Sequence, residues 1–194
     1  MEMIDILDEN GVKTGEVASR QEVHRLGLWH RVVAVAVINE RGELLVQQRS
    51  ADKEKNANLW DISVAGHIST GQDSLSAATR EINEEIGVYL DREIKVRDFC
   101  YLTCFRNERV YHQEHGDFIE RQYYDCFALY MKGLTEEDLK LQEEEVQAAK
   151  FVTVEDLQVL IESGQMVDRR EIWPVLLAKI SGGGGVLEEW SICI

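Results

Sequence analysis

The stretch from Gly66 to Val88, GHISTGQDSLSAATREINEEIGV, constrains the fold more than any other part of the chain. Its apolar residues recur at the spacing of an amphipathic helix. Asp73 or Ser74 stands where a helix N-cap belongs, and Gly87 stands where a left-handed C-terminal cap belongs. The stretch therefore predicts a helix that packs one face against a hydrophobic core.

Three glutamates share one patch of this predicted helix. Glu81, Glu84 and Glu85 are three and four residues apart, so their side chains project from neighbouring turns. They fall mainly off the apolar stripe, and like charges at this spacing destabilise an isolated helix. The cluster therefore indicates that a cation binds there.

The charge balance limits the kinds of partner that the chain can have. The formal net charge of −15 argues against binding to a nucleic acid polymer or to an anionic membrane surface. It leaves a phosphate-bearing substrate open, because bound divalent cations invert the local field. No apolar run approaches the roughly 18 residues of a membrane-spanning helix, and the first ten residues are too polar for a secretory signal.

Length and cysteine usage indicate a single intracellular domain. A chain of 194 residues suits one domain, and we assign residues 1–180 to it and residues 181–194 to a glycine-rich break and a tail. The four cysteines form no CxxC pair and no small disulfide framework. We therefore expect reduced thiols and a cytoplasmic protein.

The remaining pattern predicts a β-rich chain with interspersed helices. Strands are expected at 4–7, 31–38, 43–49, 59–66, 94–105 and 119–130 and from residue 150, with helices at 20–27, within 153–164 and at 169–180. A polar connection is expected at 106–117, and Leu45 and Gln47 suggest one covered and one exposed face of their strand. This order predicts an α/β (α+β) fold, a mixed sheet covered by helices on its faces.

Two histidines flank the end of the first predicted helix. His24 and His30 either bind a metal ion, or one caps the helix end while the other is half-buried. His112 and His115 are also spaced as metal ligands can be, but they lie in the predicted connection, and we expect them to be solvated.

The central stretch resembles the Nudix box, the signature of a large family of enzymes that cleave diphosphates. That pattern is a glycine, five residues, a glutamate, seven residues, and then R-E-aliphatic-x-E-E-x-G-aliphatic. The matching positions are Gly66, Arg80, Glu81, Ile82, Glu84, Glu85, Gly87 and Val88. One position departs from the pattern, because Gln72 stands where the family has its first glutamate. The resemblance implies that this residue holds Arg80, and a glutamine lacks the charge that strengthens such a brace.

Residues 3 to 165 further resemble the branch of the family that includes isopentenyl-diphosphate isomerase and its hydrolase relatives. The resemblance implies a Nudix α/β/α sandwich with a mixed β-sheet. In the isomerase a cysteine before the Gly-His pair and a glutamate on a later strand transfer protons. Here those positions are Ala65 and, aligned through Phe127, Gln122, which argues against isomerisation.

The resemblance also implies roles at a metal site. Glu81, Glu84, Glu85 and the carbonyl of Gly66 would bind Mg²⁺, for which Mn²⁺ can substitute. The base that takes a proton from the attacking water would be Glu81 or a glutamate of a later loop. Glu145 matches that loop best.

Three further positions match residues that contact the substrate in the isomerase-like branch. Arg49 and Lys53 correspond to residues that grip the diphosphate. His67 matches a metal ligand of the isomerase, and without the partners of that ligand it would act through hydrogen bonds to the substrate.

Three functions follow from these residues. The first is a Mg²⁺-dependent hydrolase that cleaves a diphosphate bond in a nucleoside diphosphate derivative or a similar organic diphosphate. The second is a ligand-binding or regulatory module without turnover, which only Gln72 favours, and the third is an isomerase. The expected partner is a small-molecule diphosphate, and the sequence is compatible with a homodimer.

Overall fold

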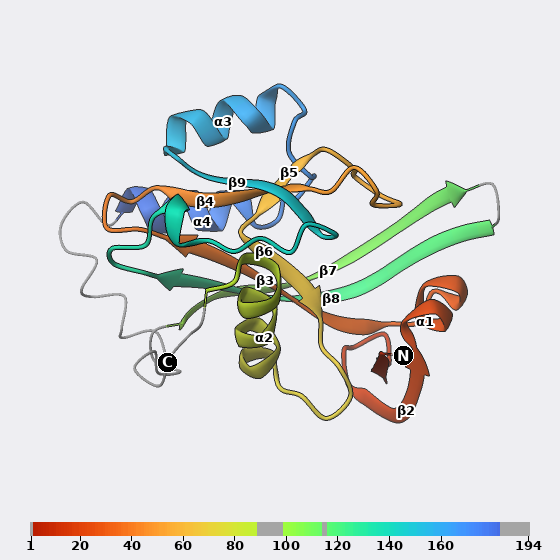
Figure 1. Ribbon diagram of the computed structural model, residues 1–194. Coiled ribbons are helices and arrows are strands. Elements are labelled where there is room, and N and C mark those ends of the chain that lie inside the picture. Colours follow the sequence, from red (N-terminus) through yellow and green to blue (C-terminus); the bar gives the residue numbers. More distant parts are fainter. Residues whose placement is uncertain (1, 89–98, 114–115, 183–194) are drawn as a thin grey trace.

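The computed structural model describes residues 2–88, 99–113 and 116–182 (Figure 1). Its elements are β1 (Met3–Leu7), β2 (Lys13–Ser19), α1 (Arg20–Leu26), β3 (His30–Ile38), β4 (Leu44–Arg49), β5 (Trp60–Ile62), β6 (Val64–His67), α2 (Ser74–Ile86), β7 (Phe99–Gln113), β8 (Gly116–Tyr130), the 3₁₀ helix η2 (Glu136–Asp138), β9 (Val146–Val152), α3 (Val154–Glu162) and α4 (Trp173–Gly182). Among these residues, no helix is long and apolar enough to cross a membrane.

A mixed sheet of seven strands forms the centre of the molecule. The strands β5, β4, β3, β8 and β7 lie in that order, while β6 also pairs with β3 and β9 also pairs with β4. The pair of β3 and β8 is parallel, whereas the other pairs are antiparallel. Because β3 is buried along nearly its whole length, its valine-rich run lies at the centre of this sheet.

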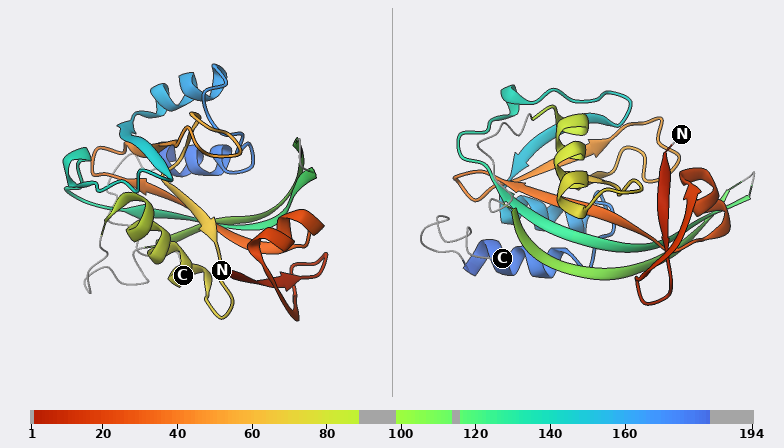
Figure 2. Two further views of the ribbon diagram at one scale, coloured as in Figure 1. Left: turned by 45° about the vertical axis from the view of Figure 1, so that its right-hand side comes forward. Right: turned by 90° about the horizontal axis from the view of Figure 1, so that it is seen from below.

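Helices cover both faces of the sheet, as the sequence predicts. On one face, Val33, Val35 and Val37 of β3 pack with the buried residues of α2. On the other face, Ala34 and Ala36 pack with α3 and α4. Figures 1 and 2 show α2 on the side of the sheet opposite to α3 and α4. The predicted α/β/α sandwich is therefore confirmed.

The N-terminal hairpin and the helix after it form as their sequence indicates. β1 and β2 pair antiparallel around the turn at Asn10 and Gly11, where Gly11 has a φ of 79°. Ser19 and Glu22 form a capping box at the start of α1, and Gly27 ends the helix in the left-handed conformation. This segment places α1 beside β8 at one end of the sheet.

The predicted polar connection at 106–117 is wrong, because most of it is strand. β7 continues to Gln113 and β8 starts at Gly116, so the two strands form a long antiparallel hairpin. Figure 1 shows this hairpin extending from the sheet past α1. Along β7 from Cys104 to Val110, half-buried residues alternate with exposed ones, which is the period of a strand with one covered face. Residues 94–98 of the predicted strand lie outside the described residues.

Two further expectations differ from the structure. Gln47 is 3% exposed rather than solvated, because α2 packs over its strand and Glu85 of that helix accepts a hydrogen bond from it. The last helix begins at Trp173 and not at Arg169, since the backbone from Arg169 to Ile172 forms a turn closed by a 2.9 Å hydrogen bond from the N–H of Ile172 to the carbonyl of Arg169. Thr153 is the N-cap of α3, and Pro174 lies in the first turn of α4.

Candidate active site

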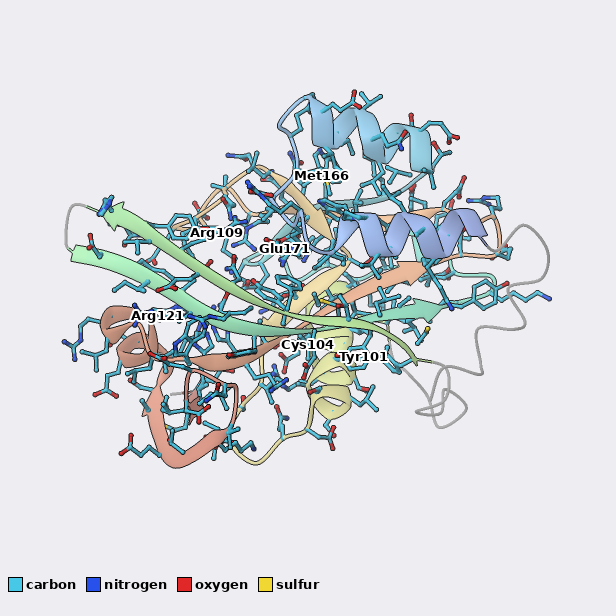
Figure 3. All side chains as sticks on the ribbon, turned by 180° about the vertical axis from the view of Figure 1, so that it is seen from behind. Tyr101, Cys104, Arg109, Arg121, Met166 and Glu171 are labelled. Carbon is cyan, nitrogen blue, oxygen red and sulfur yellow. The ribbon has the colours of Figure 1, made fainter. Side chains whose placement is uncertain are left out.

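A cavity of about 1230 Å³ lies between α2, the loop after β4, the β7–β8 hairpin and the segment before α4. All but one of the predicted site residues line it: Arg49, Lys53, Gly66, His67, Arg80, Glu81, Glu84, Glu85 and Glu145. The exception is Gln72, which lines a smaller cavity of about 350 Å³. Figure 3 labels Arg109 on the hairpin and Glu171 before α4, two further residues of the larger cavity. Residues from distant parts of the sequence therefore meet in one site.

Two of the three glutamates of α2 are buried, although the sequence placed them mainly off the apolar stripe. Glu81 is 8% exposed and Glu85 is 7% exposed, whereas Glu84 faces solvent. Burial raises the pKa of Glu81, and burial together with the charge of Glu81 raises the pKa of Glu85 to about 8. Among the described residues, one neutral donor, Gln47 Nε2, hydrogen bonds to the Glu85 carboxylate at 2.8 Å. The two carboxylates are therefore crowded, and Glu85 has no cationic hydrogen-bond partner among the described residues, which is an environment that a bound cation stabilises.

Gly66 and Arg80 fix the position of the glutamates. A Cβ at position 66 would overlap the carboxylate of Glu81, so only glycine lets the strand β6 approach the helix this closely. The guanidinium of Arg80 lies 2.8 Å from Glu81 and 2.8 Å from Glu84, and it donates to the carbonyl of His67 at 2.9 Å. Arg80 thus ties the helix to the end of β6.

The brace that the resemblance implies between Gln72 and Arg80 is incomplete. Gln72 Oε1 and Arg80 Nε are both buried, and neither has a hydrogen-bond partner within the described parts of the chain. A buried donor or acceptor without a partner costs about 1–3 kcal/mol. No hydrogen bond therefore joins Gln72 to Arg80 within the described parts of the chain.

The predicted diphosphate-binding cations lie across the cavity from α2 and are held by other groups. Lys53 forms an ion pair with Glu145, the predicted alternative base. Arg49 donates two hydrogen bonds of 3.3 Å to the carbonyl of Lys55, and its guanidinium lies 3.9 Å from Asp61. Burial and the charge of Arg49 lower the pKa of Lys53. A phosphate group would compete with Glu145 for Lys53.

His24 and His30 are both buried, so the expectation of one half-buried histidine is wrong. Together with His67 they form a cluster whose ring nitrogens lie within 4.8 Å of one another, close enough to hold one metal ion. Burial lowers the pKa of all three, to about 3 for His24 and about 4 for His30. The three rings are therefore neutral at pH 7.

Hydrogen bonds orient this cluster. His24 Nδ1 lies 3.1 Å from the carbonyl of Ile119, which can only accept, so this nitrogen carries the proton. His24 Nε2 is then the acceptor of the 3.0 Å bond from His67 Nε2. The cluster joins α1, β3, β6 and β8. The positions of the histidines in the sequence do not indicate that their side chains meet.

The sequence did not indicate two pairs of charged residues at the wall of the cavity. Asp61 and Arg169 form a buried two-point ion pair, with Arg169 NH2 2.8 Å from Asp61 Oδ2. Lys55 pairs with Glu120 of β8, and its Nζ lies 3.8 Å from the centre of the Phe118 ring. Each pair joins residues more than 60 positions apart, so no local pattern predicts it.

Comparison with known proteins agrees with this architecture. The model of the NUDIX domain matches residues 28–172. The chain belongs to the Nudix hydrolase family. An uncharacterized Nudix hydrolase of Listeria monocytogenes is 38% identical over 167 residues, which cover 86% of this chain and 89% of the relative.

A curated isomerase and a solved structure bear on the branch and on the fold, respectively. An isopentenyl-diphosphate Delta-isomerase of Streptomyces coelicolor is 29% identical over 156 residues, 80% of this chain and 73% of the isomerase. The crystal structure of DR0079 from Deinococcus radiodurans has a TM-score of 0.67 at 20% identity and covers 91% of this chain and 98% of DR0079. This Nudix chain therefore resembles both hydrolases and isomerases in sequence.

Proposed function

We propose that this Nudix protein is a Mg²⁺-dependent hydrolase that cleaves a diphosphate bond in a nucleoside diphosphate derivative or a similar organic diphosphate. The observation that carries the proposal is the buried pair Glu81 and Glu85 on α2, with the exposed Glu84 beside it, at the wall of a large cavity. The candidate ligands are all oxygen atoms, the type that Mg²⁺ prefers, and Mn²⁺ would fit the same set.

The residues present fit such an ion. Burial and the charge of Glu81 raise the pKa of Glu85 to about 8, and the backbone of Gly66 lies against the carboxylate of Glu81. We assign Glu81, Glu84, Glu85 and the Gly66 carbonyl to the metal. When bound, Mg²⁺ supplies a Lewis acid for phosphate oxygens and lowers the pKa of water.

The other residues of the cavity bind the substrate and move the proton. Arg49 offers a planar guanidinium and Lys53 a compact ammonium to the diphosphate oxygens. When Lys53 turns to a phosphate, Glu145 loses its ion pair and becomes free to accept a proton. Glu81, whose pKa is raised by burial, is the alternative base.

Kinetics of glutamate variants test this function. With Mg²⁺ and a panel of nucleoside diphosphate derivatives, wild-type protein should release a monophosphate product. Glu84→Gln and Glu85→Gln should each reduce kcat at least about 100-fold, since they remove ligands of a group worth several kcal/mol. Glu143→Gln, an exposed glutamate outside the cavity, is the matched control and should leave the rate unchanged.

The same experiment separates the alternatives. Loss of turnover in Glu145→Gln with metal binding retained would identify Glu145 as the base, whereas the same result for Glu81→Gln would favour Glu81. Absence of turnover on the whole panel would contradict the hydrolase and support a binding module. Isomerisation of isopentenyl diphosphate should not occur, because Ala65 and Gln122 occupy the two proton-transfer positions of the isomerase.

A further inference from the structure

One face of the β7–β8 hairpin lies open to the cavity. Every second residue of β7 from Phe105 to Tyr111 lines it, and so does every second residue of β8 from Phe118 to Tyr124. The register pairs Phe105 with Tyr124, Asn107 with Gln122, Arg109 with Glu120 and Tyr111 with Phe118. Residues directly opposite in an antiparallel pair share a face. The hairpin therefore presents aromatic, amide, charged and aromatic pairs in that order.

The aromatic pairs provide flat apolar surfaces on either side of the polar ones. The rings of Phe105 and Tyr124 are stacked, with centroids 4.9 Å apart and planes 4° apart. Tyr111 and Phe118 meet edge to face at 6.5 Å. Phe105 is half-buried and lines the cavity, so a planar group can pack beside it.

The charged pair is already engaged with other elements. Glu120 pairs with Lys55, and Arg109 donates a 2.9 Å hydrogen bond to the carbonyl of Asp168. The same guanidinium lies 3.2 Å from the Asp168 carboxylate. These contacts anchor the hairpin to the rest of the cavity wall, and the uncharged amide pair lies between this charged pair and the stacked aromatic pair.

The orientation of the Gln122 amide is fixed by His30. His30 Nδ1 lies 2.9 Å from the carbonyl of Leu28 and must donate to it, and burial keeps the ring neutral by lowering its pKa to about 4. His30 Nε2 is therefore an acceptor, and Gln122 Nε2 donates to it at 3.3 Å. The other atom of the amide, Gln122 Oε1, then points away from His30.

Gln122 Oε1 is an acceptor without a donor. The residue is only 3% exposed and lines the cavity, yet its Oε1 has no hydrogen-bond partner among the residues that the structure describes. Buried polar atoms in folded proteins are nearly always hydrogen-bonded. A ligand in this cavity with an N–H group would satisfy it, whereas an apolar ligand would leave it unpaired.

We propose that Gln122 and Asn107 determine the specificity of this site for a diphosphate whose organic group is a nucleobase. Gln122 Oε1 accepts a hydrogen bond from an N–H or amino group of the base, the Asn107 amide bonds to the adjacent ring atom, and Phe105 packs beside the ring. The same pair disfavours prenyl diphosphates, because an isoprene group has no N–H to donate and would leave Gln122 Oε1 unpaired. The proposal rests on the proposed function for the placement of the diphosphate at α2.

Binding of product analogues tests the pair without requiring turnover. Calorimetry in the absence of metal would compare the adenosine, cytidine, guanosine and uridine 5′-monophosphates with ribose 5-phosphate, which lacks a base. We expect wild-type protein to bind at least one nucleotide about tenfold more tightly than ribose 5-phosphate. Gln122→Leu and Asn107→Leu should each reduce this ratio severalfold and leave the affinity for ribose 5-phosphate unchanged.

Controls keep the result interpretable. Gln165→Leu replaces an exposed glutamine outside the cavity and should leave the ratio at its wild-type value. Asn107 is half-buried on a strand face, so its variant tests the proposal even if Gln122→Leu does not fold. A nucleotide preference retained in a folded variant of either residue would overturn the proposal, and so would wild-type protein that binds all four nucleotides no more tightly than ribose 5-phosphate.

The two proposals fail in different ways. Nucleotide binding that depends on Gln122, without hydrolysis of any diphosphate, would support the specificity pair and contradict the hydrolase. Hydrolysis of isopentenyl diphosphate with an efficiency equal to that of nucleoside diphosphates would overturn the specificity pair and leave the hydrolase intact.

Discussion

At the scale of single residues, the site depends on carboxylates whose surroundings change their protonation. Glu85 is buried against Glu81 and accepts one hydrogen bond from Gln47. Its pKa of about 8 means that the metal-free protein holds a proton there at pH 7. A metal ligand must be deprotonated, so this proton has to leave when a cation binds.

Mg²⁺ binding at pH 7 should therefore release protons. Calorimetric titration in buffers of different ionisation enthalpy measures this release, and the affinity should rise between pH 6 and about 8 as Glu85 loses its proton. Glu85→Gln should abolish this component of the release. An affinity independent of pH in wild-type protein would show that Glu85 is not a ligand.

The sequence predicted the three glutamates, because helical spacing alone brings residues three and four apart together. It did not predict the contact of Gln47 with Glu85, since that contact joins β4 to a helix 38 residues later. Charge repulsion indicated a cation site, whereas burial, which sets the pKa values, depends on packing between distant elements.

At the scale of elements, a single substitution in the loop before α2 can increase the stability of the protein. Gln72 Oε1 and Arg80 Nε are buried without partners among the described residues, although the family pattern places a glutamate at position 72 to hold this arginine. A carboxylate would accept a charge-assisted hydrogen bond from the guanidinium.

Gln72→Glu should stabilise the protein by about 1–2 kcal/mol, since it replaces an unpaired buried acceptor with a charged hydrogen bond. For a chain of this size the Tm should rise by roughly 2–8 °C, which thermal unfolding at pH 7 measures. Gln158→Glu, at an exposed position of α3, adds the same charge elsewhere and should not raise the Tm. A lower Tm in Gln72→Glu would mean that Arg80 does not reach position 72.

The hairpin shows where element prediction failed. Strands are recognised from apolar residues that alternate with polar ones, but the inward row of β7 contains Asn107 and Arg109. These residues face a polar cavity rather than a core, so β7 lacks the alternation of apolar and polar residues from which a strand is recognised. The same property that hid the strand makes its face suitable for binding a polar ligand.

At the scale of the whole molecule, the histidine cluster joins the N-terminal segment to the sheet. His24 from α1, His30 from β3 and His67 from β6 meet in the interior, and β8 accepts a hydrogen bond from His24. Fold class and layer order could be predicted because amphipathic periods and the Nudix box are local patterns. The meeting of three histidines from three elements could not, because it depends on the tertiary arrangement.

This cluster should make folding stability depend on pH. In the unfolded chain each histidine titrates near pH 6.5, whereas burial lowers the folded-state pKa to about 3 for His24 and about 4 for His30. Between pH 6.5 and about 4 the unfolded state therefore binds more protons, and stability falls as pH falls. Each histidine contributes up to about 1.4 kcal/mol per pH unit in that window.

Urea unfolding at pH 7, 6 and 5 measures this dependence. The experiment uses the Glu85→Gln background, because the raised pKa of Glu85 has the opposite effect: it favours the folded state as pH falls from about 8 to 4.5. Replacing His24 with glutamine should reduce the loss of stability between pH 6 and 5 by up to about 1.4 kcal/mol. His112→Gln, at an exposed position, is the matched control and should retain the full loss. Equal pH dependence in the two variants would mean that His24 is protonated in the folded protein, and the hydrogen bond from His67 to His24 would then be absent.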